Sequence, residues 1–481
     1  MQGISKRIFF WTLTALFFVI TPLVIFYALG YRFNSQRGIF VFTGSLSIKA
    51  NPLNVEIYID QELKNGSLNR INSTYHVGGL KPGDHLIEVK AEGYNTWSKK
   101  ITVNSGTSTE FWNILLSKND YARTDFPSDG IDKFFFDPGK KLIAYTHNDT
   151  GNLSVSVLDL SNDESSDIFS SDEYFFTSDK KENIEWSPQS KKIIIPVEKD
   201  GKKNYFLVDV KTKEIIDLKN IAGTEDISKV RWDKDNKNFI YYISEGNIHY
   251  LNTLNPEEKR IVAKNVASYD LSSSYVYYFQ LPSGIVYRTN YNGVDEPEQM
   301  TTSAPEKMSD PSYQITVYDP IRIALLNKSG DLYIHNMGVL KDYFKNLSSG
   351  ISEIQFSDDG KKMLYWSDSE ICVYFLRDWE VQPWRNENDQ KEVIRFSEKI
   401  DNVQWEKDYE HVVFSVGSKM KVAEIDSRSQ NNTQDVISLT GNSNKIVSDF
   451  GENKIYFTDV DNGISKLYSI DFPEKTGILG F

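Results

Sequence analysis

The side chains that most often carry chemistry are few and scattered in this sequence. The single cysteine, Cys372, cannot form an intramolecular disulfide or a thiolate zinc site. No two of the six histidines have the i, i+4 or short-strand spacing of a zinc site. These histidines are His76, His85, His147, His249, His335 and His411. There is no Gly-x-Ser-x-Gly elbow and no glycine loop of the phosphate-binding kind. The sequence therefore predicts no catalytic, metal-binding or cofactor-binding residue.

Two acidic motifs come close to known sites without matching them. Asp459-Val460-Asp461-Asn462-Gly463 lacks the third acidic position and the distant glutamate of a calcium loop, so we interpret it as a hairpin turn. Ser357-Asp358-Asp359-Gly360 lacks the spacer and the later tryptophan of a sialidase Asp-box. Carboxylate pairs for glycoside hydrolysis are invisible in sequence, because their separation is set by the fold. An enzymatic activity therefore stays uncertain, and we favour a protein that is not an enzyme.

Composition narrows the class of protein further. The chain has 481 residues, 40% of them hydrophobic and 13% aromatic, which is too apolar for intrinsic disorder. Its net charge is −13, which argues against nucleic acid as a partner. Residues 1–37 hold four basic residues and no acid, so the remainder has 50 basic residues against 67 acids, a charge of −17. A basic head on an acidic body suggests a membrane end and a solvated body.

Residues 8–30 form an uncharged apolar stretch that we predict to be a transmembrane helix, preceded by a short basic flank over 1–7. A helix of 23 residues is about 34 Å long, enough for a bilayer core of about 30 Å. The alternative is a signal peptide cleaved near Ala28-Leu29-Gly30, although the stretch exceeds the usual length of such peptides. A short flank before a large body is typical of a signal anchor. We therefore hypothesise a single-pass protein of the cell membrane whose C-terminal body is extracytoplasmic.

After a linker over 31–39, the pattern changes to the period of two that half-buried strands show. Four runs alternate polar and apolar residues and are separated by turn residues. They are 45–50, 55–60, 86–90 and 100–103. Lys81-Pro82-Gly83-Asp84 is a turn in which proline presets φ and glycine supplies a positive φ. This pattern predicts a small antiparallel β domain over 40–118.

The stretch from Gly44 to Leu116 resembles a PEGA domain. The resemblance rests on Val55-x-Ile57-x-Ile59-Asp60, on the run from Leu80 through Pro82-Gly83-Asp84-His85 to Val89, and on Gly93-Tyr94. The loop after Asp60 departs from the family, which usually has glycine there. The resemblance implies a small β-sandwich of a kind common on envelope proteins, without catalysis. We expect His85 to bond to its turn and not to bind a metal with His76.

Four aromatic residues in this domain are more typical of a core than of a ligand platform. They are Tyr94, Trp97, Phe111 and Trp112. We therefore expect them to pack inside the sandwich.

Residues 119–481 contain a repeat of about 40–50 residues made only of short strands. Each copy has an aromatic or apolar residue, a polar turn with lysine and an apolar strand, as in Trp186-Ser187-Pro188-Gln189-Ser190-Lys191-Lys192-Ile193. The repeat starts are 136, 186, 232, 271, 317, 356, 405 and 448. Such a repeat predicts a β-propeller of four-stranded blades. Eight blades are favoured and seven are the alternative, because three copies are weak.

The Trp/Phe-Ser-Pro-x-x-Lys-Lys-apolar form resembles the TolB-like, WD40-like repeat of bacterial propellers. About four copies match well, whereas the copy around Tyr269-Asp270-Leu271-Ser272 lacks the proline or glycine turn. We expect the repeated tryptophans and phenylalanines to pack between blades.

Together these features predict a mainly β protein with an N-terminal transmembrane helix, a PEGA-like β-sandwich and a β-propeller. We interpret it as an envelope protein that binds or scaffolds a protein or a cell-wall polymer, with the lipid bilayer as a further partner of its helix. The binding residues are unknown from sequence. The alternative is a propeller-fold hydrolase or lyase acting on envelope glycans through acidic residues in the channel. An acidic body should repel anionic polymers unless a local basic patch exists.

Overall fold

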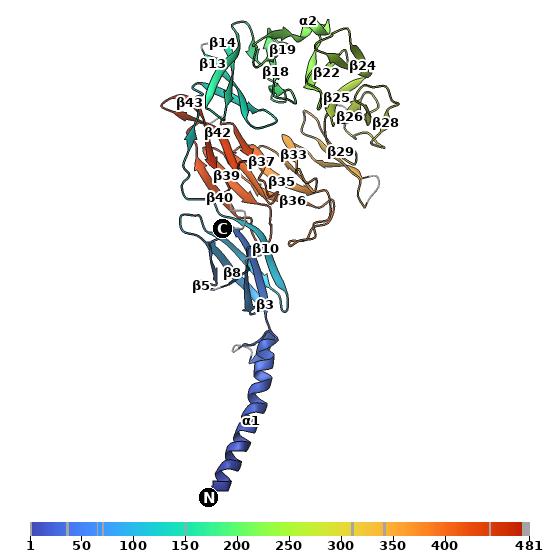
Figure 1. Ribbon diagram of the computed structural model, residues 1–481. Helices are drawn as coiled ribbons and strands as arrows, with labels where there is room; N and C mark the ends of the chain where they lie inside the picture. The colour runs from blue at the N-terminus through green and yellow to red at the C-terminus, as the bar shows by residue number, and fades with distance from the viewer. Residues whose placement is uncertain are drawn as a thin grey trace.

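The computed structural model describes residues 2–34, 38–64, 66–69, 72–149, 152–308, 312–339, 343–441 and 444–473. An N-terminal helix, a β-sandwich and a β-propeller follow one another, and the sandwich lies between the other two (Figure 1). Helix α1 (Gln2–Ala28) contains the one helical span in the described residues that is long and apolar enough to cross a membrane. That span, Arg7–Ala28, has a mean hydropathy of 2.3 and is not buried by the rest of the chain.

Helix α1 continues into a short β-hairpin. Gly30 has a φ of 92°, which suits the left-handed end of a helix. Strands β1 (Tyr31–Asn34) and β2 (Ile39–Phe42) then pair antiparallel, so the predicted linker over 31–39 contains a strand. The hairpin leaves large apolar side chains exposed, namely Phe33, Ile39, Phe40 and Phe42. An apolar surface therefore extends beyond the helix.

The sandwich consists of two four-stranded sheets with strand orders β10-β3-β7-β6 and β5-β4-β8-β9. The bounds are β3 (Gly44–Asn51), β4 (Glu56–Ile59), β5 (Glu62–Leu63), β6 (Ser67–Asn69), β7 (Thr74–Leu80), β8 (Gly83–Lys90), β9 (Trp97–Val103) and β10 (Ser108–Leu115). Burial alternates along β3 and β9, as the period of two predicts. The buried faces form one core that includes Leu46, Ile57, Val89 and Trp97.

Eight sheets follow in the described residues, numbered here sheet 1 to sheet 8 in the order of their first strands. The first strands are β12 (Ile131–Phe136), β16 (Phe175–Phe176) with β17 (Glu185–Trp186), β21 (Ser228–Trp232), β25 (Val266–Leu271), β29 (Gln314–Asp319), β33 (Glu353–Phe356), β37 (Ile400–Trp405) and β41 (Ile446–Asp449). Each of the eight predicted repeat starts lies within two residues of the end of a different first strand, because the repeat marks the turn into the second strand.

The second strands are β13 (Leu142–Asp149), β18 (Lys192–Lys199), β22 (Phe239–Ser244), β26 (Tyr275–Gln280), β30 (Arg322–Leu326), β34 (Lys362–Trp366), β38 (His411–Val416) and β42 (Lys454–Asp461). The third strands are β14 (Asn152–Asp159), β19 (Lys202–Asp209), β23 (Asn247–Asn252), β27 (Ile285–Asn290), β31 (Leu332–Asn336), β35 (Glu370–Phe375), β39 (Lys419–Glu424) and β43 (Ile464–Asp471).

The fourth strands are β15 (Glu164–Ser171), β20 (Ile215–Asp217), β24 (Lys259–Ala263), β28 (Glu298–Gln299), β32 (Phe344–Ser348), β36 (Gln390–Arg395), β40 (Thr433–Ser438) and, in sheet 8, β11 (Thr124–Asp125). A short helix, α2 (Leu218–Ala222), follows β20. Asp217 caps its N-terminus, and its carboxylate accepts a hydrogen bond from the backbone N–H of Lys219.

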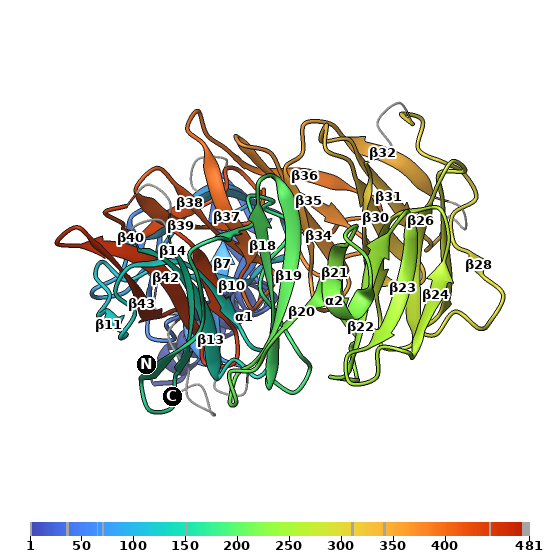
Figure 2. The same ribbon diagram turned by 90° about the horizontal axis from the view of Figure 1, so that it is seen from above.

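Hydrophobic packing between neighbouring sheets closes the ring. Eight buried clusters each combine residues of two successive sheets, and one of them joins sheet 8 to sheet 1 through Phe134, Tyr145, Tyr456 and Leu467. In both views the red strands β42 and β43 lie beside the teal strands β13 and β14 (Figures 1 and 2). Because each sheet buries both faces against its neighbours, the eight sheets form a closed β-propeller.

Sheet 8 takes its strands from both ends of the propeller sequence. Strand β11 pairs antiparallel with β43, with Thr124 opposite Ser469 and Asp125 opposite Tyr468. The backbone N–H of Phe126 also donates to the Leu467 carbonyl at 3.1 Å. The start of the propeller is therefore tied to its last strand.

Candidate functional site

The sandwich docks on the propeller through a buried ionic contact. The Lys99 side chain on β9 is fully buried, and its Nζ lies 2.6 Å from Oε1 of Glu424 at the end of β39. The Trp97 indole donates to Oε2 of the same carboxylate at 3.0 Å, and Asp426 lies 3.6 Å from Lys99. A buried lysine needs such partners, because an isolated charge is costly to remove from water. The two domains are therefore held in one fixed arrangement.

A loop of sheet 6 covers the open edge of the sandwich. Gln382 accepts a hydrogen bond from the Glu110 N–H at 3.1 Å and donates to the Ser108 carbonyl at 3.0 Å, as a neighbouring strand would. Arg428 donates to the Glu110 carbonyl at 2.8 Å and lies over the Phe111 ring at 4.2 Å. These contacts satisfy the edge strand β10 and leave a cavity beside it.

That cavity, here called the cleft, has a volume of about 230 Å³ and lies between the two domains. The sandwich contributes Trp112, which is 37% exposed, and the sheet 6 loop contributes the partly buried Trp379. Polar groups from the sheet 7 strands and loops complete the lining, namely Asp408, Glu410, His411, Glu424, Asp426 and Arg428. Aromatic walls with a few fixed polar groups are typical of small-ligand sites.

The charged side of the cleft is internally paired. His411 Nδ1 lies 2.7 Å from Oδ2 of Asp408, and Lys362 Nζ lies 2.8 Å from Oε1 of Glu410. Lys362 also lies 3.9 Å from the centre of the Trp379 ring, which fixes that indole by a cation–π contact.

These pairs shift the protonation of the groups that form them. Burial lowers the pKa of His411, but the Asp408 carboxylate outweighs this and raises it to about 9. Burial raises the pKa of Glu410, against the opposing effect of Lys362. At neutral pH His411 is therefore a cation bound to Asp408, rather than a free base.

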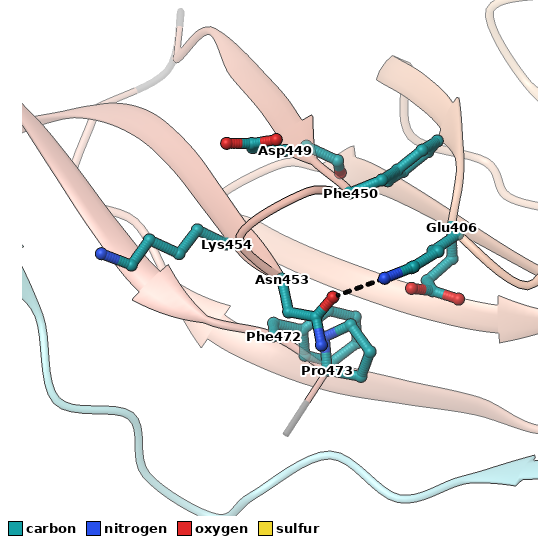
Figure 3. A pocket seen from close by; sticks show the side chains of 9 residues that line it. Glu406, Asp449, Phe450, Asn453, Lys454, Phe472 and Pro473 are labelled. Atoms are coloured by element: carbon teal, nitrogen blue, oxygen red, sulfur yellow. Dashed lines mark hydrogen bonds between the residues drawn. The ribbon is translucent and has the colours of Figure 1, made fainter. Parts of the chain in front are cut away.

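A second cavity next to sheets 7 and 8 is much smaller. Its volume of about 10 Å³ allows one water molecule at most. Lys407 Nζ donates to Oδ1 of Asn453 at 3.1 Å. Figure 3 shows Asn453 with Phe450, Glu406 and Phe472 around this cavity. Burial and then Asp408 raise the pKa of Glu406 to about 8, so this carboxyl is largely protonated. The cavity is a packing gap beside a protonated acid and not a ligand site.

Polar side chains just before several repeat starts are used by the ring itself. The polar residue before a repeat start accepts a hydrogen bond from the backbone N–H of the next repeat start. The pairs are Glu185 with Trp232 (3.1 Å), Asp270 with Val317 (2.8 Å), Gln355 with Trp405 (3.0 Å) and Gln404 with Ser448 (2.8 Å). Glu185 and Asp270 therefore hold first strands together.

The repeated tryptophans complete this network, as well as packing between sheets as expected. The indoles of Trp186, Trp232 and Trp405 donate to a backbone carbonyl of the preceding sheet at 3.0, 3.2 and 3.3 Å. Each also belongs to a buried cluster shared by two sheets. The signal for this network was present in the sequence, since polar residues precede several repeat starts.

Other sequence predictions can be placed in the same way. His85 Nε2 lies 2.7 Å from the Lys81 carbonyl of its turn, as expected, and Nδ1 lies 2.6 Å from Asp60. Asn462 and Gly463 form the two-residue turn between β42 and β43, with positive φ at both. Within the described residues no group of histidine, cysteine and acidic side chains could hold a metal.

The aromatic residues of the sandwich divide into two groups. Trp97 and Phe111 are in its core, and Tyr94 packs against that core while partly exposed. Trp112 was predicted to be in the core and is instead exposed in the cleft, because its neighbour Phe111 takes the inward position on β10. Cys372 is buried, and burial raises the pKa of its thiol to about 12.

Comparison with known proteins gives one family match and several structural likenesses. Residues 43–118 match the PEGA domain family. No curated protein is significantly similar to the chain in sequence. Similar solved structures include the Dos1 propeller, with 11% identity, a TM-score of 0.48, and coverage of 73% of this chain and 94% of that one. A eukaryotic initiation factor has 11% identity, a TM-score of 0.46 and coverage of 76% and 88%. The sandwich, which the family match covers, is a PEGA domain, and the closed ring of sheets described above makes the larger domain a β-propeller.

Proposed function

We propose that the protein is an envelope binding protein, anchored by α1, whose cleft holds a segment of a cell-wall glycan. The observation that carries the proposal is that the PEGA domain and the propeller each contribute a tryptophan, Trp112 and Trp379, to one cavity. Indole rings offer large rigid surfaces for the apolar faces of a sugar ring, and Asp426, Arg428 and Gln382 offer hydrogen-bonding groups beside them.

The apolar hairpin supports the membrane part of the proposal. Phe33 and Phe40 are 55% and 43% exposed and lie beside the end of α1, with Phe40 stacked on Phe26 of the helix. The Arg32 guanidinium lies 3.6 Å from the centre of the Tyr27 ring. Aromatic residues of this kind are enriched at membrane interfaces. The hairpin thus lies in the interface and the PEGA domain spaces the propeller from the bilayer, on the outer side of the membrane.

Binding is tested with the full chain in detergent micelles and soluble glycan strands prepared from cell wall. Titration followed by tryptophan fluorescence should give saturable binding. Trp112→Ala and Trp379→Phe should each weaken it at least tenfold. The matched control is Trp384→Ala, because Trp384 is 72% exposed and outside the cleft lining. Absence of glycan binding, or equal loss in all three variants, would refute the proposed ligand.

The side of the membrane is tested by adding protease to intact cells that carry a tag after Phe481. Digestion of the tag supports an extracytoplasmic body. Protection that vanishes on lysis contradicts it, or indicates a body enclosed by an outer membrane.

A hydrolase acting on the same glycan is the second candidate function. Asp408 and Glu410 line one cleft and have pKa values displaced in opposite directions, which is a pattern of acid–base pairs. However, Asp408 already forms an ion pair with His411, and Glu410 forms one with Lys362. Release of reducing ends from the glycan, abolished in Glu410→Gln, would favour the enzyme over the binding protein.

A further inference from the structure

Lysines from several sheets gather in the propeller channel. The position three residues before a repeat start is Lys133 in sheet 1, Lys229 in sheet 3 and Lys445 just before sheet 8. Lys181 precedes the first strand β17 of sheet 2. In sheet 6 the same position is an acid, Glu353.

These side chains come from different sheets of the ring and lie within electrostatic range of one another. Lys181 and Lys445 both interact electrostatically with the Glu353 carboxylate. Lys445 is also close enough to Lys133, and Lys229 to Lys181, for mutual repulsion. Sheets 2 and 6 are four places apart in a ring of eight, so Lys181 and Glu353 come from opposite sides. Groups from opposite sides interact only where they reach toward the centre.

The neighbouring acids neutralise these lysines only in part. Asp179 and Glu182 are both bound by Lys203, each at 2.8 Å, and Glu182 also accepts a hydrogen bond from Tyr205. Glu185 is paired with Arg231. Glu353 is thus the one carboxylate facing the group that has no ion pair among the described residues.

The lysine ammonium groups themselves are poorly satisfied. Lys229 donates to the Ala267 carbonyl at 2.9 Å. Over the described residues, no hydrogen bond or ion pair is formed by Nζ of Lys133, Lys181 or Lys445, although Lys133 lies 4.8 Å from the Phe176 ring centre. Burial lowers the pKa of Lys181 and Lys445, and lowers that of Lys229 to about 8. Lys181 is exposed and the other three lysines are partly buried, so an anion can reach them, and cations that lie close together gain from an added anion.

We propose that the channel is an oxyanion site, in which Lys133, Lys181, Lys229 and Lys445 bind a phosphate or carboxylate group of an anionic ligand. The site goes beyond the cleft and does not depend on it. The chain as a whole carries −13, so this local excess of positive charge is not a general property of its surface. Five lysines, counting Lys203, against Glu353, Asp179 and Glu182 leave a net charge of about +2, which suits a multiply charged anion.

The test uses the full chain in detergent micelles, with pyrophosphate and citrate as probes, titrated calorimetrically at constant ionic strength. Saturable binding is expected, and Lys181→Gln/Lys445→Gln should weaken it at least tenfold. The matched control is Lys211→Gln/Lys213→Gln, which removes the same charge from the exposed turn between β19 and β20. Preference for pyrophosphate indicates a phosphorylated ligand, and preference for citrate indicates a carboxylated one.

A second variant is expected to bind the probes more tightly instead of more weakly, so the proposal can still be tested if the double variant folds poorly. Glu353→Gln removes the carboxylate near the lysines that has no ion pair among the described residues, and it should tighten binding about threefold or more. Absence of binding by both probes overturns the proposal, as does equal weakening by the control pair or weaker binding by Glu353→Gln. Because the cleft is untouched, glycan binding in the same variants separates failure of this site from failure of the proposed function.

Discussion

The domain junction and the propeller channel both bring charged side chains together, but they neutralise them to different degrees. At the junction, Lys99 is enclosed by Glu424 and Asp426, and Lys362 by Glu410. In the channel, Lys181 and Lys445 share Glu353 and have no ion pair of their own within the described residues. Complete ion pairing suits the junction, which must hold two domains in one arrangement. Incomplete ion pairing suits a site whose charge is completed by a bound ligand.

The largest effect should come from removing the junction cation. Lys99→Met leaves Glu424 without its cation inside the interface, whereas Asp426 keeps its ion pair with Arg428. The loss of one partner of a buried pair costs about 3–5 kcal/mol. We expect the free energy of unfolding to fall by that amount in denaturant titrations. The sandwich should also become sensitive to proteases at the linker to the propeller.

Lys100→Met is the matched control for that change. Lys100 is the next residue on β9, its side chain is 67% exposed, and it lies 3.5 Å from Asp84. Exposed pairs are worth less than about 1 kcal/mol, so this variant should be nearly unchanged. Equal effects at both positions would mean that the buried ion pair does not hold the domains together.

The two regions should also respond to pH with opposite signs. The pKa of His411 is raised from 6.5 to about 9, so its contribution to stability is complete below pH 6.5 and is lost as the pH rises through 9. The pKa of Lys229 is lowered from 10.5 to about 8, so its contribution improves as the pH rises from 8 to 10.5. Each effect should be on the order of 1–2 kcal/mol.

Denaturant midpoints measured from pH 6 to 10.5 check both signs. His411→Gln should remove the loss of stability between pH 6.5 and 9. Lys229→Met should remove the gain above pH 8. If the denaturant midpoint of His411→Gln still falls between pH 6.5 and 9, as in the unchanged protein, then the pKa of His411 is not raised.

The smallest effect, and the one that best defines the contrast, is expected for Lys445→Met. The substitution is the same as at Lys99, yet here it removes a desolvated charge and its repulsion with Lys133. Stability should be unchanged or higher by up to about 1 kcal/mol, because replacing unneutralised buried charge with an apolar side chain is often neutral or stabilising. A loss of 2 kcal/mol or more would show that the channel lysine is structurally paired after all.

The repeat made much of the propeller predictable. Its eight starts lie within two residues of the ends of eight first strands, since an aromatic or apolar residue and a polar turn recur where a first strand leads into a second. The PEGA strands were predictable for a similar reason, because alternation along β3, β4, β8 and β9 reflects one buried face. A strand can be predicted from the local sequence when the local sequence pattern is what determines it.

The cleft could not be predicted, because it depends on residues that are far apart in the sequence. Lys99 and Lys100 look alike in the sequence, and only docking against Glu424 makes the first a buried residue. Trp112 was assigned to the core because an aromatic pair in a strand gives no sign of which ring faces inward. Convergence of Lys181, Lys445 and Glu353 likewise requires the ring to be closed.

The pairing of β11 with β43 also sets the order of events during synthesis. The partners of Thr124 and Asp125 are Ser469 and Tyr468, so sheet 8 stays incomplete until more than 340 further residues have left the ribosome. Until then the faces of sheets 1 and 7 that sheet 8 will cover remain open to other chains. A nascent polypeptide in this condition needs protection from aggregation until its last strand arrives, and a ribosome that stalls before Ser469 yields a ring that cannot close.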